Sequence, residues 1–381
     1  MKKILVIGFM LVSCSIMAQW SNEFEFVSSS GYEYNIYKNP LSYSSDEDTF
    51  DETDLLINAP YWKLTIGDQL AYNWKQQSLE LKGKVIKQFY KNVSYANNLD
   101  IYSRLRYQAE IEKFKLKLAT YFINRDRNDL FEIDDKYRYP LPYAENKYFA
   151  EINYKLTKYI QLTGYSNLKF RNYKEIPDIG KTSYNEYLSG LNFKKRIRIK
   201  KRTYHYFYLN GEFANRNYNK KSFIVDEDID HDLAVTSSTI NWKYYRGEIA
   251  YKAKFGKFIK VKPGFKYEYR DDRINTKYQY NQYSPFLALD FEFKNTKISL
   301  DGEKRYRTYN RNIANELGEP KKYKYEFWKF AIKYTFSISN NFVLYLESSA
   351  YIKDSNYTKE TVLSGRPYNY FKSEFGIHII L

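Results

Sequence analysis

The segment Lys257-Phe258-Ile259-Lys260-Val261-Lys262-Pro263-Gly264-Phe265-Lys266-Tyr267-Glu268-Tyr269-Arg270 alternates between two kinds of side chain. Apolar and aromatic residues occupy most of the odd positions, and charged residues occupy most of the even positions. A period of two residues is typical of a β-strand with one apolar face and one polar face. The segment has 14 residues, whereas a strand in a soluble protein averages about five or six.

The same alternation recurs along the chain, for example from Phe114 to Phe122. Tilted strands of about nine to eleven residues are long enough to cross a bilayer. The pattern therefore predicts an all-β fold, a transmembrane antiparallel up-and-down β-barrel with about sixteen strands (a range of about 14–18). The expected strands are 22–38, 60–74, 78–91, 99–112, 114–124, 145–156, 159–172, 184–196, 203–217, 238–254, 257–270, 277–293, 297–310, 323–337, 341–353 and 366–381.

Short and long connections alternate between these segments. Links such as Lys75 to Gln77 and Ile338 to Asn340 are short, and the long polar links are 39–59, 125–144, 173–183, 218–237, 311–322 and 354–365. Outer-membrane barrels have short periplasmic turns and longer external loops. A lipid-exposed sheet must also close on itself, because every backbone N–H and C=O needs a partner.

Composition excludes a helical membrane protein. Mean hydropathy is −0.69, and no internal run approaches the ~18 apolar residues of a membrane helix. The chain contains 43 Tyr and 26 Phe, and tyrosine suits both an interfacial girdle and a wet lumen. A secreted β-sandwich or solenoid is the rival fold, but it does not account for the strand lengths.

The N-terminus has the features of a signal peptide in residues 1–18, and the barrel is expected over 19–381. Lys2 and Lys3 precede the apolar run Ile4 to Val12, and Ile16-Met17-Ala18 forms a cleavage site. Cys14 follows Leu11-Val12-Ser13 in a sequence that resembles a lipobox, so a lipidated Cys14 is the alternative. Removing Lys2 and Lys3 lowers the formal net charge from +16 to +14.

The last eight residues are Glu374-Phe375-Gly376-Ile377-His378-Ile379-Ile380-Leu381. Gly376, Ile379 and Leu381 occupy the positions that resemble the signal by which the barrel-assembly machinery recognises a final strand. Leu381 departs from that signal, which usually ends in an aromatic residue. A terminal amphipathic strand is the alternative interpretation.

The inward faces of the expected strands gather charge. The basic residues proposed to govern selectivity are Arg104, Arg106, Lys169, Arg171, Lys260, Lys262, Lys266, Arg305 and Arg307, with Lys115 and Lys117 on the same face. The inward carboxylates are Glu110, Glu112, Glu151, Glu248, Asp290, Glu292, Asp301 and Glu303. Excess positive charge in a confined pore favours anions, whereas charges paired in cross-strand ladders give no selectivity.

Five inward tyrosines, Tyr165, Tyr206, Tyr208, Tyr325 and Tyr345, could stack on sugar rings or simply fill polar strand faces. Asp226, Asp228, Asp230 and Asp232 alternate at a spacing that suits Ca²⁺, with a solvated acidic loop as the alternative. The three histidines form no readable pair with a serine nucleophile, so no enzyme activity is expected. No cofactor and no nucleic-acid partner are expected.

In strand number, connections and final strand the chain resembles general outer-membrane porins. Gly31-Tyr32-Glu33-Tyr34-Asn35-Ile36-Tyr37 also resembles the first strand of barrels that export surface lipoproteins, but the helical-repeat domain of that family is missing. The Tyr- and Lys-rich usage resembles that of Bacteroidota.

The resemblance to porins implies a passive outer-membrane porin for small hydrophilic solutes, with a mild anion preference. The alternative is a non-conducting barrel that binds a surface lipoprotein, a secretion complex or a glycan. Outer-membrane lipid, lipopolysaccharide and the barrel-assembly machinery are the implied partners, and a homo-oligomer is compatible with this class.

Overall fold

The computed structural model describes residues 20–36, 43–44, 49–50, 56–127, 142–173, 183–200, 203–223, 237–256, 258–272, 278–314, 319–356 and 367–381. In these ranges sixteen antiparallel strands form one closed barrel, which confirms the predicted fold class. The barrel strands are β1 (Trp20–Tyr34), β4 (Ala59–Trp74), β5 (Gln77–Tyr90), β6 (Asn98–Ile111), β7 (Phe114–Arg127), β8 (Tyr143–Lys155), β9 (Ile160–Tyr173), β10 (Tyr184–Lys200), β11 (Thr203–Phe223), β12 (Ser237–Phe255), β13 (Ile259–Asp272), β14 (Tyr280–Phe293), β15 (Thr296–Ile313), β16 (Lys322–Ser337), β17 (Phe342–Ser355) and β18 (Tyr368–Ile380).

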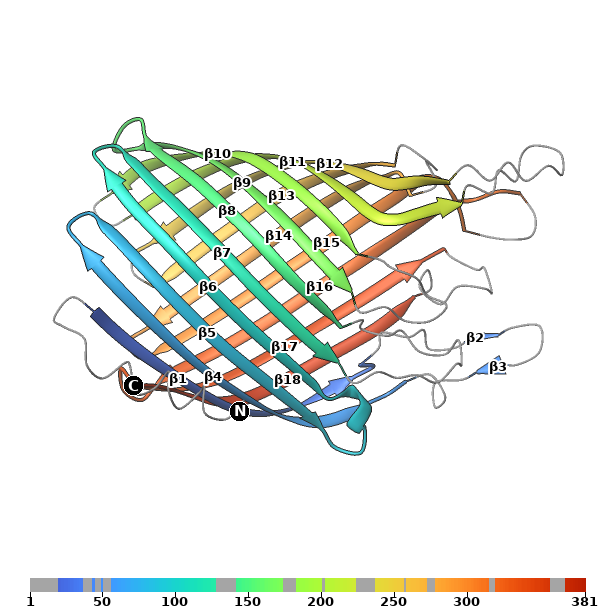
Figure 1. Ribbon diagram of the computed structural model, residues 1–381, viewed down its shortest axis with the longest axis horizontal. Coiled ribbons are helices and arrows are strands. Elements are labelled where there is room, and N and C mark those ends of the chain that lie inside the picture. Colours follow the sequence, from blue (N-terminus) through green and yellow to red (C-terminus); the bar gives the residue numbers. More distant parts are fainter. Residues whose placement is uncertain are drawn as a thin grey trace.

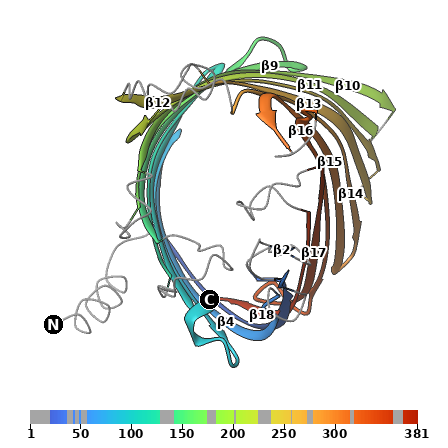
Figure 2. The ribbon, with the colours of Figure 1, turned by 90° about the vertical axis from the view of Figure 1, so that its right-hand side faces the viewer.

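Each barrel strand pairs with the next one in the chain, and β18 closes the ring on β1 through ten registered residue pairs from Glu25↔Ile380 to Tyr34↔Phe371. Figure 1 shows the tilted strands, and Figure 2 shows from one end how they form a closed ring. Two-residue strands β2 (Tyr43–Ser44) and β3 (Thr49–Phe50) pair with each other between β1 and β4, and the short 3₁₀ helix η1 (Ser94–Ala96) precedes β6. A ring of about sixteen strands is too wide for its wall side chains to fill the interior. Among the described residues no helix has the length and apolarity needed to cross a membrane.

Tight hairpins mark one end of the barrel, here called the short-turn end. Lys75, Glu112 and Lys294 begin three of these two-residue links with φ of 51°, 49° and 41°, the left-handed conformation that matches strand twist in a tight hairpin. The backbone of Leu381 exchanges two hydrogen bonds with Phe24, so both ends of the described barrel lie at this end. Short turns face the periplasm in outer-membrane barrels. Glu112 was predicted on an inward strand face; it lies in a turn instead, because β6 already ends at Ile111.

The alternation predicted from sequence sets the two surfaces of the wall. Large apolar side chains such as Ile66, Leu105 and Leu209 are 45%, 45% and 52% exposed, and their neighbours along each strand point to the opposite, inward face. Backbone pairing joins neighbouring strands all the way around the ring, which is the condition for crossing a bilayer as a sheet.

Strand β1 stops at Tyr34 rather than at residue 38 as predicted. Asn35 has φ 55° and is fully buried. Its backbone N–H donates to Asn58 Oδ1 at 2.7 Å. Its Nδ2 donates to the Asn369 carbonyl at 2.6 Å. Asparagine is one of the few residues that adopts this backbone conformation without a large penalty.

Replacing Asn35 with valine should therefore destabilise the barrel by about 2 kcal/mol, through backbone strain and the lost side-chain hydrogen bond. Urea unfolding in lipid vesicles measures the change. Asn35→Gly is the matched control, because glycine accepts the backbone but cannot make the side-chain bond, and it should cost about half as much. Equal stability of the valine variant and the wild type would show that this corner does not hold the end of β1.

Candidate permeation pathway

The nine basic residues predicted to govern selectivity all lie on inward strand faces, and each forms an ion pair. The pairs are Arg104 and Arg106 with Glu80, Lys169 with Glu186, Arg171 with Glu145, Lys260 with Glu292, Lys262 with Glu248, Lys266 and Arg305 with Glu303, and Arg307 with Glu268. Lys117 on the same face pairs with Glu151. This is the arrangement of a cross-strand ladder. The paired carboxylates cancel much of the positive charge that these cations would otherwise give the wall. Their role in selectivity stays a prediction.

Two glutamates each join cations from two other strands. The Glu186 carboxylate lies 2.6 Å from both Lys169 Nζ and Arg216 Nη2, and Glu268 faces Arg246 and Arg307. Together with Glu145 and Arg171 these residues form a band across β8 to β15, here called the charge belt. Ionised partners that share hydrogen bonds hold one another in fixed rotamers. The belt therefore gives the lumen a hydrophilic, ordered wall.

Tyrosine rings cover the guanidinium groups of the charge belt. The Arg307 guanidinium carbon lies 3.7 Å from the Tyr280 ring centroid, and that of Arg216 lies 4.5 Å from the Tyr184 centroid. Such cation–π contacts contribute about 0.5–2 kcal/mol each, depending on solvation. They also account for part of the unusual tyrosine content, because an inward tyrosine can stack on a cation and still have its hydroxyl hydrogen-bonded.

The closing seam between β18, β1 and β4 contains two buried glutamates. Glu374 accepts hydrogen bonds from Tyr61 Oη at 2.8 Å and Tyr345 Oη at 2.6 Å, and it pairs with Lys63. Glu33 accepts from Tyr90 Oη at 2.7 Å and Tyr370 Oη at 2.8 Å, and it pairs with Lys372 at 3.3 Å. Each carboxylate thereby connects strands from the two ends of the chain. Neither glutamate was predicted as a functional residue, because its partners are more than 300 positions away or on another strand.

The five inward tyrosines divide into two groups. The Tyr165 hydroxyl donates to Glu212 at 2.5 Å, and the Tyr345 hydroxyl donates to Glu374, so both are used within the wall. Tyr325 lies against Arg307 in the charge belt. Tyr206 and Tyr208 differ, because their rings stack on each other with centroids 6.3 Å apart and face several basic side chains.

The residues of the predicted assembly signal lie in the strand that closes the barrel. Gly376 pairs with Ser29 of β1 and Tyr345 of β17, Ile379 pairs with Phe26 on the apolar outer face, and Leu381 is 71% exposed at the end of the strand. The terminal segment is thus the strand that closes the barrel. This placement is compatible both with an assembly signal and with a simple terminal amphipathic strand. Recognition by assembly machinery remains a prediction.

The acidic tract with Asp226, Asp228, Asp230 and Asp232 lies outside the described residues, as do residues 1–18, the predicted signal peptide. Among the residues that are described, no group of three or more His, Cys, Asp or Glu side chains is placed to hold a metal ion.

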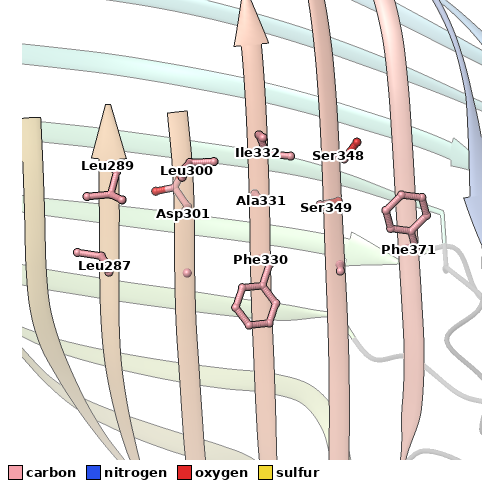
Figure 3. A pocket seen from close by; sticks show the side chains of 12 residues that line it. Leu287, Leu289, Leu300, Asp301, Phe330, Ala331, Ile332, Ser348, Ser349 and Phe371 are labelled. Carbon is pink, nitrogen blue, oxygen red and sulfur yellow. The ribbon is translucent and has the colours of Figure 1, made fainter. Parts of the chain in front are cut away.

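The outer face contains a shallow apolar hollow over β14 to β18, with a volume of about 420 Å³. Leu287, Phe330, Ile332 and Phe371 rise around small residues, including Gly302, as Figure 3 shows for the labelled side chains. Removing surface of this kind from water contributes roughly 25 cal/mol per Å². Lipid chains are the environment that suits this face.

Aromatic residues border the apolar face near the short turns. Trp20, Tyr72 and Trp74 form a chain of ring contacts, with centroids 4.9 Å and 5.1 Å apart, and Tyr107 continues it. Tryptophan and tyrosine at one height are typical of a membrane–water interface. They place the bilayer boundary at this end of the barrel.

Lys304 shares its register with outward apolar residues, where a lysine is tolerated only near a membrane interface. Its Nζ lies 2.8 Å from Glu326 and 4.2 Å from the Trp328 ring centroid. The Lys304 ammonium therefore has an acidic partner and an aromatic neighbour on the outer face, as expected for a lysine in the interfacial aromatic girdle of a membrane barrel.

A group of inward cations near the short-turn end was not predicted as a site from the sequence. Lys194 and Arg196 of β10 and Lys252 and Lys254 of β12, here called the basic cluster, make no ion pair with any described carboxylate. The run from Lys194 to Arg202, with seven basic residues among nine, was the available signal.

The arrangement of the two wall surfaces defines the class of protein. A closed antiparallel barrel that is apolar outside and charged inside spans a membrane with strands, and bacterial barrels of this kind reside in the outer membrane. The chain is an outer-membrane β-barrel.

Comparison with known proteins adds only likenesses of fold. No protein-family model and no curated protein matches the chain. It is similar to OccAB3 of Acinetobacter baumannii (10% identity, TM-score 0.49, 96% of this chain and 100% of that chain). It is also similar to OprB of Pseudomonas putida (9%, 0.45, 95% and 94%) and to OmpT, an outer membrane protein of Vibrio cholerae (10%, 0.45, 96% and 100%). Identities this low carry no information about activity.

Proposed function

We propose that the protein is a channel for the passive diffusion of small hydrophilic solutes, with a mild preference for anions. The observation that carries the proposal is the closed wall of sixteen strands with an ion-paired, tyrosine-rich inner face. Such a wall solvates polar solutes, and a ring of this size is wide enough for water. Because the basic cluster has no described acidic partner, the inner wall retains excess positive charge, which supports anion preference.

Single-channel recording of the purified barrel in planar bilayers tests the proposal. We expect discrete conductance steps and, in a KCl gradient, a reversal potential of the sign that chloride preference gives. A shift between boiled and unboiled protein in detergent gels first establishes that the sample is folded. Folded protein that stays silent at high concentration would reject the channel and favour the alternative, a non-conducting barrel that binds a surface lipoprotein, a secretion complex or a glycan.

A further inference from the structure

We propose that the basic cluster is a binding site for polyvalent oxyanions, such as the phosphate groups of small solutes, on the inner wall near the short-turn end. The inference rests on the proposed channel function and names a substrate class for it. Its four members are Lys194, Arg196, Lys252 and Lys254.

The strand register brings these residues together. Lys194 and Arg196 lie opposite Tyr208 and Tyr206 of β11, and on the other side of β11 Tyr206 lies opposite Lys252. Lys254 lies opposite Tyr204, one inward position closer to the turn. All occupy even-numbered positions, the inward face that β10, β11 and β12 share with the charge belt. The cluster therefore spans three adjacent strands at one height of the lumen.

Tyrosine rings contact three of the four cations of the basic cluster. Lys194 Nζ and Lys254 Nζ lie 5.1 Å and 5.9 Å from the same Tyr206 ring centroid. The Arg196 guanidinium carbon lies 3.9 Å from the Tyr204 centroid. Stacking on a ring leaves the planar edge of a guanidinium free to make two parallel hydrogen bonds with an oxyanion.

The basic cluster lacks the ion pairs that the predicted selectivity residues form with carboxylates in the wall. Within the described part of the chain no carboxylate lies within ion-pair distance of these four residues, and Arg196 Nε is shielded from solvent without a hydrogen-bond partner. Asp290 attracts Lys252 only from beyond ion-pair distance and accepts a hydrogen bond from Ser299 at 2.8 Å, and Glu248 pairs with Lys262. Four like charges in a partly desolvated wall repel one another, and rings compensate only a part of that repulsion.

A polyvalent oxyanion fits this arrangement better than chloride does. Its attraction to fixed cations grows with the product of the charges, and its several oxygen atoms can accept from lysine and arginine at once. Because the cluster faces the lumen, lipid headgroups on the outside of the barrel cannot reach it, which leaves a dissolved solute as the ligand.

Equilibrium titration of the folded, full-length barrel in detergent with pyrophosphate tests the site without requiring conduction. We expect saturable binding that is tighter for pyrophosphate than for inorganic phosphate, and a loss of affinity of about tenfold or more in the variant Lys194→Ser, Arg196→Ser, Lys252→Ser, Lys254→Ser. Lys333→Ser is the matched control, because Lys333 is an inward lysine near the same end that is already paired with Glu347 at 3.0 Å. It should change affinity less than about twofold.

The outcomes separate this inference from the channel proposal. A silent bilayer with specific pyrophosphate binding rejects the channel and retains the site. A conducting barrel whose pyrophosphate affinity is the same in the serine variant and in the wild type overturns the site and retains the channel. The single variant Lys252→Ser, compared directly with Lys333→Ser, keeps the test decisive if the fourfold variant does not fold.

Discussion

A valine at position 376 is expected to lower the free energy of unfolding of the barrel by about 3 kcal/mol or to prevent closure altogether. A Cβ at Gly376 would lie 2.6 Å from Cζ and Oη of Tyr345 and 2.7 Å from the Ser29 Cβ. The Tyr345 ring fills the space above this glycine so that its hydroxyl can donate to Glu374. Valine must displace the ring, which adds the cost of overpacking to that of a lost hydrogen bond to a charged group. Urea unfolding in lipid vesicles and the heat-dependent gel shift measure the effect.

Gly247→Val is the matched control for this prediction. Gly247 lies on the outer face of β12, and a Cβ there meets no atom within 4 Å, so the variant should change stability by less than about 0.5 kcal/mol. Combining Gly376→Val with Tyr345→Ala should recover part of the loss, because the smaller side chain leaves room for valine. If both glycine variants are equally stable, the close approach of Tyr345 does not matter for closure.

The strands could be predicted from the sequence because their signal is local. Each of the sixteen predicted segments coincides with an observed strand, and most ends agree within a few residues. The main differences are at three strand ends. β1 stops at Tyr34 instead of residue 38, and β10 and β11 continue to Lys200 and Phe223 instead of ending at residues 196 and 217. In β10 the alternation of Ile197 and Ile199 with Arg198 and Lys200 continues to the observed end, so the predicted end was too early. In β11 the sequence Tyr218-Asn219-Lys220-Lys221-Ser222 no longer alternates, although backbone pairing persists.

The inward placement of the charged residues was also predictable, because it follows from the same period of two. Their partners were not. Lys63 pairs with Glu374 across 311 positions, and that contact depends on how the ring closes. Likewise, whether an inward cation meets a carboxylate depends on the register between strands, which alternation within one strand does not determine. This is why the paired residues were named as selectivity candidates and the basic cluster was not.

Removing the cations and removing the anion of one ion-paired group in the lumen wall are expected to change ion selectivity in opposite directions. Glu80 receives Arg104 and Arg106 from the neighbouring strand, and all three side chains face inward. Replacing both arginines with serine leaves the Glu80 charge uncompensated and should move the reversal potential toward cation preference. Glu80→Gln leaves two uncompensated arginines and should move it toward anion preference.

The triple variant with serine at both arginines and glutamine at position 80 serves as the control, since it removes the pair of opposing effects together. Its net charge is one unit below that of the wild type, so its reversal potential should shift toward cation preference by about half as much as that of the double arginine variant. Extending the serine changes to Arg305 and Arg307 should enlarge the shift toward cations, because Glu303 and Glu268 would each lose one of their two cationic partners. Reversal potentials in a roughly tenfold KCl gradient distinguish these variants. Shifts of the same sign from the arginine and the glutamate changes would mean that ions do not pass this part of the wall.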